Sequence, residues 1–299
     1  MVSLWDADNK TWAAVNVSAA LEDAGTPISV KERSPLAAAS TGPPDYTFEM
    51  HLYFLTQTDN VGEIYTTDPA GKNWSTGDLM KSPSKTAAET SDLAAVWHRC
   101  AVGCAGYIYV AYEDDDQAIN VLNSSDWTRT DTQLFDGYQI DPESGLAMIP
   151  FISDSGKEDM NPGELRLYWD ASADLNELKF NMSAVWEGGL QIAVSIPTDP
   201  QPQYAASPFD DYLQTLVVSR KPEGTISGYR WDNVTWHTKQ NITISGGPSP
   251  ANFSSIAMNM AGRFYGVMDG KIEEYSWFAT DPYTFTHVGS VDIVNSTAS

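Results

Sequence analysis

The sequence predicts an all-β fold, a β-propeller, and two observations carry this prediction. Five segments share an opening pattern around an alanine, and these alanines, at positions 37, 94, 147, 205 and 257, recur at intervals of 52 to 58 residues. Each opening is followed by three more short runs in which apolar and polar residues alternate, and these runs are rich in Tyr, Val, Leu and Ile. Four short strands in about fifty residues match one propeller blade.

The predicted strands follow one another in the same order in every unit. The opening run predicts the innermost strand, where a small alanine avoids crowding at the axis. The openings are Ser34–Ala38, Ser91–Ala95, Ser144–Met148, Gln203–Ala206 and Ser254–Met258. An aromatic run predicts the second strand, at Met50–Phe54, Tyr107–Ala111, Leu165–Trp169, Leu213–Val217 and Gly262–Gly266. The alternative to a propeller is a β-sandwich with coincidental spacing.

A third run and a closing aromatic residue complete each unit. The third runs are Glu63–Tyr65, Ala118–Asn120, Glu177–Lys179, Gly228–Arg230 and Glu274–Ser276. The closing residues are Trp74, Trp127, Trp186, Trp236 and Phe285. We expect these large rings to sit on the outer strand and to cover the face between neighbouring blades. No stretch of helical period is longer than about two turns.

The repeat predicts one domain over residues 1–299. The predicted blades span approximately residues 30–80, 90–135, 143–195, 203–245 and 254–290, with a half-blade at 1–20. In that half-blade, Val2–Trp5 resembles the third run and Trp12–Val15 the closing run, so its two opening strands would lie before Met1. The tail Val291–Val294 is long enough for only one of them. We expect a six-bladed ring completed by joining the two ends.

Composition excludes several classes of protein. Of the 299 residues, 42% are hydrophobic and 19% charged, so the chain can bury a core and is not disordered by composition. Forty acidic against 17 basic residues give a net charge of −23. Such a surface repels phosphate backbones, so we expect no nucleic-acid partner. No run of eighteen apolar residues occurs, and we expect no direct membrane insertion.

The asparagines predict a secreted glycoprotein. Nine of the fourteen Asn residues stand in N-x-[ST] sequons, where chance would give about two or three. These are Asn9, Asn16, Asn73, Asn123, Asn181, Asn233, Asn241, Asn252 and Asn295. An enrichment of Ser, Thr and Asn in turns is the other explanation, but turn composition does not fix a two-residue offset. We therefore expect an extracellular protein, either free or the ectodomain of an anchored surface protein.

The chain has two cysteines, Cys100 and Cys104, separated by three residues. In a secreted chain this spacing predicts one small disulfide that pins a turn. A metal site would need more ligands than these two and the nearby His98 offer, and the spacing is not that of a redox CxxC motif. A loop this short gains little entropic stabilisation from the bond.

Two columns of polar residues emerge when the runs are aligned. The second runs contribute His51, Ile108, Arg166, Gln214 and Arg263. The third runs contribute Glu63, Ala118, Glu177, Gly228 and Glu274. Because 10 to 14 residues separate the members of each pair, a hairpin places them opposite one another. Three units then pair a basic residue with Glu, either as a structural ion pair or as a clamp for vicinal sugar hydroxyls.

This pattern, R-x-Y in the second strand, Glu about eleven residues on and a closing Trp, resembles the fungal fucose-specific lectins of the orange-peel-mushroom type. The resemblance implies a six-bladed propeller with fucose pockets between blades. It assigns Arg166 and Glu177 to the best-matching pocket, with Phe209 or Tyr204 as its aromatic wall. Arg263 and Glu274 come second. His51, Glu63 and Trp97 form a third pocket that lacks the Arg, and units two and four have lost the pair.

Other constellations give weaker signals. Glu113–Asp116 could supply oxygens to Ca²⁺, but a solvated hairpin turn explains it as well. Asp210 and Asp211 invite comparison with glycosidase carboxylates, although strand neighbours point to opposite faces. The four His residues are spread over separate units, so we nominate no metal site, cofactor or catalytic residue. We therefore predict a lectin-like protein that binds fucosylated or similar glycans without catalysis. A secreted effector or scaffold that binds a protein partner is the alternative, followed by a propeller glycoside hydrolase; the oligomeric state is open.

Overall fold

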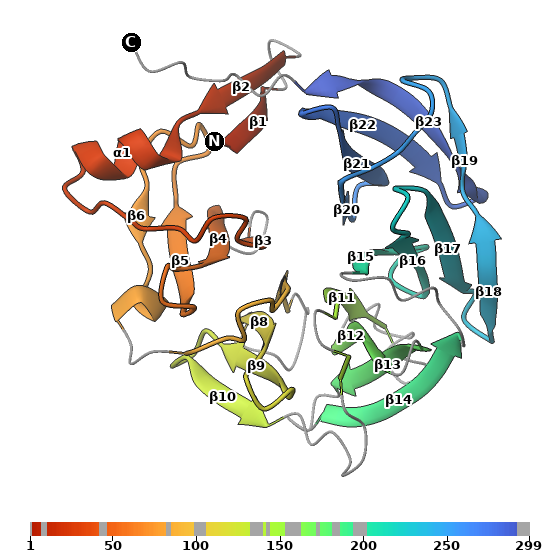
Figure 1. Ribbon diagram of the computed structural model, residues 1–299, viewed down its shortest axis with the longest axis horizontal. Coiled ribbons are helices and arrows are strands. Elements are labelled where there is room, and N and C mark those ends of the chain that lie inside the picture. Colours follow the sequence, from red (N-terminus) through yellow and green to blue (C-terminus); the bar gives the residue numbers. More distant parts are fainter. Residues whose placement is uncertain are drawn as a thin grey trace.

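The computed structural model of the chain describes residues 2–6, 11–41, 47–81, 85–98, 106–131, 140–141, 144–152, 163–171, 174–180, 186–193 and 202–291. Within these residues, the strands form six separate sheets: a two-stranded hairpin, four sheets of four strands and one of five. Consecutive sheets stand side by side around a central axis (Figure 1). The predicted β-propeller is therefore confirmed.

Five sheets are blades, numbered here in chain order. Blade 1 holds β3 (Leu36–Thr41), β4 (Glu49–Leu55), β5 (Val61–Thr66) and β6 (Ser75–Thr76). Blade 2 holds β7 (Leu93–Trp97), β8 (Ile108–Glu113), β9 (Ile119–Asn123) and β10 (Thr128–Asp131). Blade 3 holds β11 (Ala147–Phe151), β12 (Glu164–Ala171), β13 (Asp174–Phe180) and β14 (Trp186–Ala193).

The last two blades follow the same antiparallel order. Blade 4 holds β15 (Gln203–Phe209), β16 (Gln214–Arg220), β17 (Ile226–Trp231) and β18 (Trp236–Asn241). Blade 5 holds β20 (Ser255–Asn259), β21 (Arg263–Met268), β22 (Lys271–Phe278) and β23 (Asp281–Val291). A fifth strand, β19 (Thr243–Ser245), pairs in parallel with the outer edge of β23. It covers an edge that would otherwise be open.

Helical structure is sparse among the described residues. The helix α1 (Val17–Asp23) begins at Asn16, whose side-chain oxygen accepts a hydrogen bond from the N–H of Ala19. Val17 and Leu21 bury its apolar side against blade 1. A short 3₁₀ helix, η1 (Asp78–Lys81), follows β6. No described helix has the length and apolar character needed to cross a membrane.

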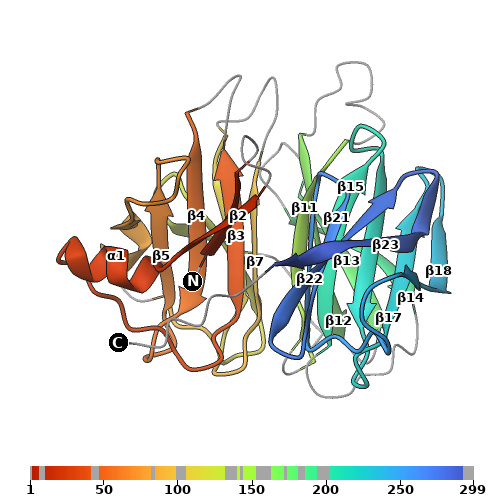
Figure 2. The ribbon, with the colours of Figure 1, turned by 90° about the horizontal axis from the view of Figure 1, so that it is seen from above.

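The N-terminal hairpin occupies the sixth position of the ring. Its strands β1 (Val2–Asp6) and β2 (Thr11–Val15) lie between blade 5 and blade 1 (Figures 1 and 2). Val2 and Val15 pack against blade 1. No described strand fills the two inner places of this position. Leu36, on the face of β3 turned toward it, is consequently 73% exposed, whereas the equivalent Leu93 and Leu146 are 4% and 3% exposed.

The hydrophobic core is divided between the blades. Each consecutive pair of blades encloses its own cluster, and a fifth cluster joins blade 1 to the hairpin and α1. The alternating side chains of every strand therefore serve two interfaces, one on each face of its sheet. Because the closing tryptophans belong to these clusters, each blade depends on its neighbours for burial of its apolar surface.

The serine of the repeated opening has a structural role. The Oγ atoms of Ser34, Ser91 and Ser144 accept hydrogen bonds from backbone N–H groups at the far end of the second strand, at 2.7, 2.8 and 3.0 Å. Adjacent inner strands are also joined directly. Carboxylate and amide side chains accept from the next blade, Asp92 from the N–H of Leu146 and Gln203 from that of Ile256. The repeated opening thus contributes hydrogen bonds within a blade and hydrogen bonds to the next blade.

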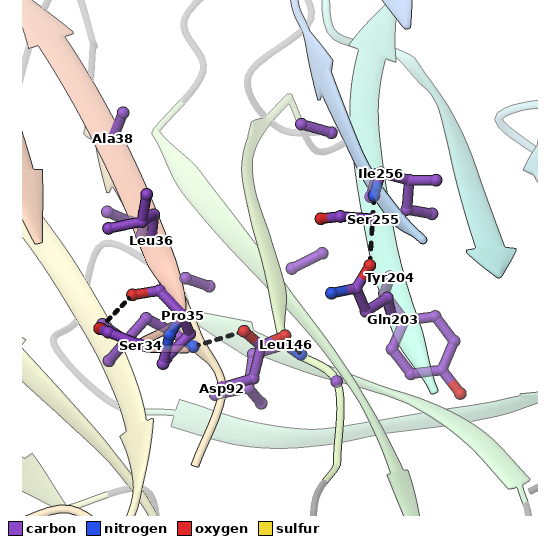
Figure 3. Close-up of a pocket in the computed structure, with 18 of the residues that line it drawn as sticks. Ser34, Pro35, Leu36, Ala38, Asp92, Leu146, Gln203, Tyr204, Ser255 and Ile256 are labelled. Atoms are coloured by element: carbon purple, nitrogen blue, oxygen red, sulfur yellow. Dashed lines mark hydrogen bonds between the residues drawn. The ribbon is translucent and has the colours of Figure 1, made fainter. Parts of the chain in front are cut away.

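A cavity of about 840 Å³ runs along the axis, lined by the inner strands of all five blades. Leu36 and Ile256 lie on opposite sides of it, and the bonds from Leu146 to Asp92 and from Ile256 to Gln203 lie along its wall (Figure 3). Tyr265 and Val267 of β21 also line the cavity. The axial space therefore extends onto the face of blade 5 that is turned toward the hairpin.

Several sequence predictions concern side chains on or near the surface. Cys100 and Cys104 lie outside the described residues, so their disulfide stays a prediction. So do the sequons at Asn9, Asn181 and Asn295. The remaining six acceptor asparagines are all exposed or half-buried. Their glycosylation is a prediction that this geometry permits.

Asp170, at the end of β12, makes the stability of blade 3 depend on pH. Its carboxylate accepts a hydrogen bond from Ser144 through one oxygen, while the other is buried without a partner. Burial, reinforced by the charge of Asp141, raises the pKa of this carboxyl from 3.8 to about 7. The folded state therefore holds the proton more tightly than the unfolded chain. This stabilisation is complete below about pH 4 and is lost as the pH rises through 7.

We expect the ionisation of Asp170 to lower the free energy of unfolding by about 2–3 kcal/mol between pH 5 and pH 8, as measured by urea denaturation. Asp170→Asn cannot ionise and should remove most of that difference. An Asp170→Asn variant with the pH dependence of the wild type would contradict the assignment.

Candidate functional site

Blades 1, 3 and 5 carry the same polar arrangement. In each, a tyrosine of the second strand pairs in register with the anchoring alanine on one side and with a glutamate of the third strand on the other. The tyrosine hydroxyl donates to that carboxylate at 3.3 to 3.4 Å. A basic residue stands two positions before the tyrosine. The sets are His51, Tyr53 and Glu63; Arg166, Tyr168 and Glu177; and Arg263, Tyr265 and Glu274.

The set in blade 5 is more open to solvent than the other two, through its arginine. Arg263 Nε donates to Glu274 Oε1 at 3.0 Å, and the two side chains are 37% and 12% exposed. Strand alternation turns this face of β21 toward the N-terminal hairpin. On β2, Trp12 is three residues from Val15, which packs on blade 1, so Trp12 lies on the opposite face, turned toward blade 5. The arginine of the pair is therefore reachable by a ligand, with an aromatic residue on the facing strand.

The set in blade 3 is buried. Arg166 and Glu177 are each 6% exposed. The Arg166 guanidinium lies 2.6 Å from Glu164 and 3.7 Å from Glu177, and its carbon is 4.4 Å from the ring centroid of Phe151. Burial raises the pKa of Glu177 although Arg166 and Lys179 oppose that rise. Glu164 already holds one guanidinium nitrogen of Arg166, and a ligand could reach the buried guanidinium only after side chains move.

The set in blade 1 is also closed. Glu63 is 2% exposed and accepts from His51 at 2.9 Å and from the backbone N–H of Leu79 at 3.1 Å. Burial alone would lower the pKa of His51, but its hydrogen bonds to the carboxylates of Glu63 and Glu49 outweigh that effect and raise it. The residue after β6, Gly77, lies so close that a Cβ there would be 2.0 Å from the Glu63 carboxylate. The chain itself covers this carboxylate.

The predicted columns are wrong in blades 2 and 4. The residue equivalent to Arg166 is Tyr109 in blade 2, not Ile108, and Leu216 in blade 4, not Gln214. In the third strand of blade 2, Val121 takes the place expected for Ala118. The cause is the point at which each second run begins: relative to the partner of the anchoring alanine, the run starts one residue earlier in blade 2 and two residues earlier in blade 4 than in blades 1, 3 and 5.

The cleft between blades 2 and 3 is filled by rings. His98 lies 5.7 Å from Tyr109 and 5.9 Å from Phe180, measured between ring centroids. Its Nε2 atom is 3.0 Å from the carbonyl oxygen of Gly163, and burial lowers its pKa. An aromatic plug thus replaces the basic and acidic pair here.

The aromatic walls differ in part from those expected. Phe209 does not face Arg166: its ring is 5.4 Å from that of Trp277, in the interface of blades 4 and 5. Tyr204 lies in the interface of blades 3 and 4, beside Gly145, with its hydroxyl buried and unpaired. Trp97 shares the core of blades 1 and 2 with Tyr53. Alternation along β15 explains Phe209, since Ser207 of the same face bonds to blade 5.

Sequence reasoning missed the rings that actually approach the tyrosines. The closing Trp127 of blade 2 lies edge-on to Tyr53, and Trp236 of blade 4 lies edge-on to Tyr168, each at 6.1 Å. The signal was present, because the closing residues recur as regularly as the alanines. These two closing rings each cover the tyrosine of the preceding blade.

The remaining candidates form no site. Asp114 Oδ1 accepts from the backbone N–H groups of Asp116 and Ala118, as expected of a hairpin turn. Asp210 and Asp211 both have positive φ and lie in the turn between β15 and β16. Among the residues that the structure describes, no group of three or more His, Cys, Asp or Glu side chains could hold a metal ion.

Fold and clefts together define a β-propeller whose inter-blade faces carry paired basic and acidic side chains. No protein-family model and no curated protein matches the chain. Solved structures do match it. A point mutant of the Aleuria aurantia lectin, in complex with α-methyl-L-fucoside, is 20% identical with a TM-score of 0.68, over 88% of this chain and 79% of the lectin. That lectin is described as a six-bladed β-propeller with a novel fucose recognition mode.

Two further lectins have the same fold. AofleA from Arthrobotrys oligospora is 20% identical with a TM-score of 0.66, over 88% of this chain and 74% of that protein. The SapL1 lectin, in complex with α-methyl fucoside, is 18% identical with a TM-score of 0.64, over 94% and 85% of the two chains. The resemblance found in the repeat therefore extends to three dimensions. At these identities it establishes the fold of the chain.

The two arginines should contribute differently to stability. Removing Arg166 leaves the buried carboxylate of Glu177 with only Lys179, at 3.5 Å, as a cationic partner. We expect Arg166→Ala to lower the free energy of unfolding by about 3 kcal/mol. Arg263→Ala, the matched control in the exposed set, should lower it by less than about 1 kcal/mol. Urea denaturation of both variants measures the difference, and equal losses would show that burial does not separate the two pairs.

Proposed function

We propose that the protein is a non-catalytic carbohydrate-binding protein whose principal site is the open set in blade 5. The observation that carries this proposal is the exposure of Arg263, whose side chain is 37% exposed and pairs with the largely buried carboxylate of Glu274. The equivalent pairs in blades 1 and 3 are buried. A ligand can therefore meet a preformed clamp in the cleft that faces the hairpin.

The chemistry of this clamp suits vicinal hydroxyl groups. The guanidinium offers only donors and the carboxylate only acceptors, so adjacent hydroxyls can donate to one and accept from the other in a single orientation. Tyr265 holds Glu274 through its hydroxyl at 3.4 Å and fixes the carboxylate. Trp12, on the facing strand, supplies an apolar surface for the hydrophobic side of a sugar ring.

The structural neighbours support fucose as the sugar to test. Two of the lectins with this fold are described in complex with α-methyl fucoside. The sequons support secretion as a glycoprotein, and fucosylated glycans are the proposed partners. A protein partner is the second candidate function, favoured by the closure of the clefts in blades 1 and 3.

We expect α-methyl-L-fucoside to bind the chain, measured by isothermal titration calorimetry. Arg263→Ala and Glu274→Gln should each weaken this binding about tenfold to a hundredfold, because each removes charge-assisted hydrogen bonds worth about 1.5–3 kcal/mol. Trp12→Ala should weaken it as well.

Arg33→Ala is the matched control, since Arg33 is exposed and belongs to none of the three sets. It should bind like the wild type. Binding unaffected by Glu274→Gln would exclude this cleft, and a chain that binds no fucoside in the titration and no sugar on a glycan array would favour the protein-binding alternative.

A further inference from the structure

We propose that the interface of blades 4 and 5 holds a separate binding site, centred on Arg230, for the carboxylate of an acidic sugar. Arg230 lies on β17, Gln214 beside it on β16, and Phe209 on β15, while Trp277 comes from β22 of the next blade. These strands lie side by side in Figure 1. The site goes beyond the proposed function of the blade 5 cleft and does not require it.

The guanidinium of Arg230 has no acidic partner. Its Nε and Nη2 atoms both donate to one neutral oxygen, Oε1 of Gln214, at 3.1 and 2.6 Å. Arg166 and Arg263, by contrast, pair with glutamates. Among the described residues, no carboxylate lies within ion-pair distance of Arg230. Because a guanidinium carries five N–H donors in a fixed fork, its remaining edge can hold a carboxylate through two parallel hydrogen bonds.

Two carboxylates near this arginine are engaged elsewhere. Asp210 accepts from the amide nitrogen of Gln214 at 2.7 Å, which directs the amide oxygen toward Arg230. Asp232 accepts from two backbone N–H groups of its own turn and pairs with His237, an arrangement that lowers its pKa to about 2. Neither acid therefore neutralises Arg230 directly. The rest of the −23 net charge is largely screened beyond about 8 Å at physiological ionic strength.

Aromatic side chains form the rest of the interface. The guanidinium carbon of Arg230 stands 5.8 Å from the ring centroid of Phe209, and Trp277 packs perpendicular to that ring at 5.4 Å. Trp277 is 3% exposed, yet its Nε1–H has no partner. The hydroxyl of Tyr283 is likewise buried and unpaired, and Tyr283 is close enough for the charge of Arg230 to lower its pKa against the larger effect of burial.

The ladder shows why this interface differs in chemistry from the others. Gly228 occupies the position that holds a glutamate in blades 1, 3 and 5, and a Cβ there would lie 3.1 Å from the ring of Tyr283. The interface thus lacks the carboxylate acceptor and instead gathers donors: a guanidinium edge, an indole N–H and a phenol. A set of donors without an acceptor favours a ligand that brings negative charge. A uronic acid combines a carboxylate for Arg230 with an apolar ring face for the half-buried Phe209.

The test compares methyl β-D-glucuronide with the neutral methyl β-D-glucoside in titrations followed by tryptophan fluorescence and calorimetry. We expect the glucuronide to bind at least tenfold more tightly than the glucoside. Arg230→Gln should weaken glucuronide binding at least tenfold, and Arg230→Lys, which keeps the charge but loses the fork, should weaken it several-fold. Arg33→Gln, at an exposed arginine outside the interface of blades 4 and 5, should leave it unchanged.

A separate arm keeps this site distinct from the proposed fucoside site. Glu274→Gln should leave glucuronide binding intact, and Arg230→Gln should leave fucoside binding intact. The proposal is overturned if the glucuronide does not bind, if the glucoside binds equally well, or if folded Arg230→Gln and Arg230→Lys variants both bind it like the wild type. Loss of fucoside binding alone would count only against the blade 5 cleft.

Discussion

Every blade of this protein depends on its neighbour to cover one face of its sheet. A single four-stranded sheet has two apolar faces and cannot bury either alone, so the core is divided into clusters between consecutive blades. The consequence is visible where the ring is incomplete. At the sixth position only the outer hairpin β1–β2 is present among the described strands, and Leu36, whose equivalents in the next two blades are nearly inaccessible, is largely exposed.

The same dependence decides which polar pairs a ligand can reach. Where two full blades meet, apolar packing surrounds the pair and takes up its hydrogen-bonding capacity, as at Glu63 and Arg166. A buried charge is tolerated only when its partners satisfy it, so these side chains are held by protein groups. Where blade 5 meets the hairpin, less chain covers the pair, and Arg263 remains accessible. Accessibility thus follows from the position in the ring, although the three sets share one sequence pattern.

Much of this architecture could be predicted from the sequence, because repetition is a signal that does not require knowledge of contacts. The alanines, the second-strand tyrosines and the glutamates recur with spacings that strand pairing must respect, and those in blades 1, 3 and 5 stand in register. The errors have local causes. Runs that begin early displaced the columns of blades 2 and 4, and strand alternation turned Phe209 away from Arg166. Glu164, two residues before Arg166, pairs with a guanidinium that spacing alone presented as free.

A repeated interface that both stabilises the ring and binds ligand cannot do both with the same atoms. The nitrogen that Arg166 gives to Glu164, and its ion pair with Glu177, are withheld from a sugar, whereas Arg230 gives two of its donors to a single neutral oxygen. The clefts therefore differ in which hydrogen-bond donors and acceptors the protein leaves available to a ligand. A donor and an acceptor remain accessible beside the hairpin, and donors alone remain between blades 4 and 5. Divergence of one repeat can in this way produce sites of different ligand chemistry on one scaffold, because changing a glutamate to a glycine alters the charge of a cleft without altering the strand that carries it.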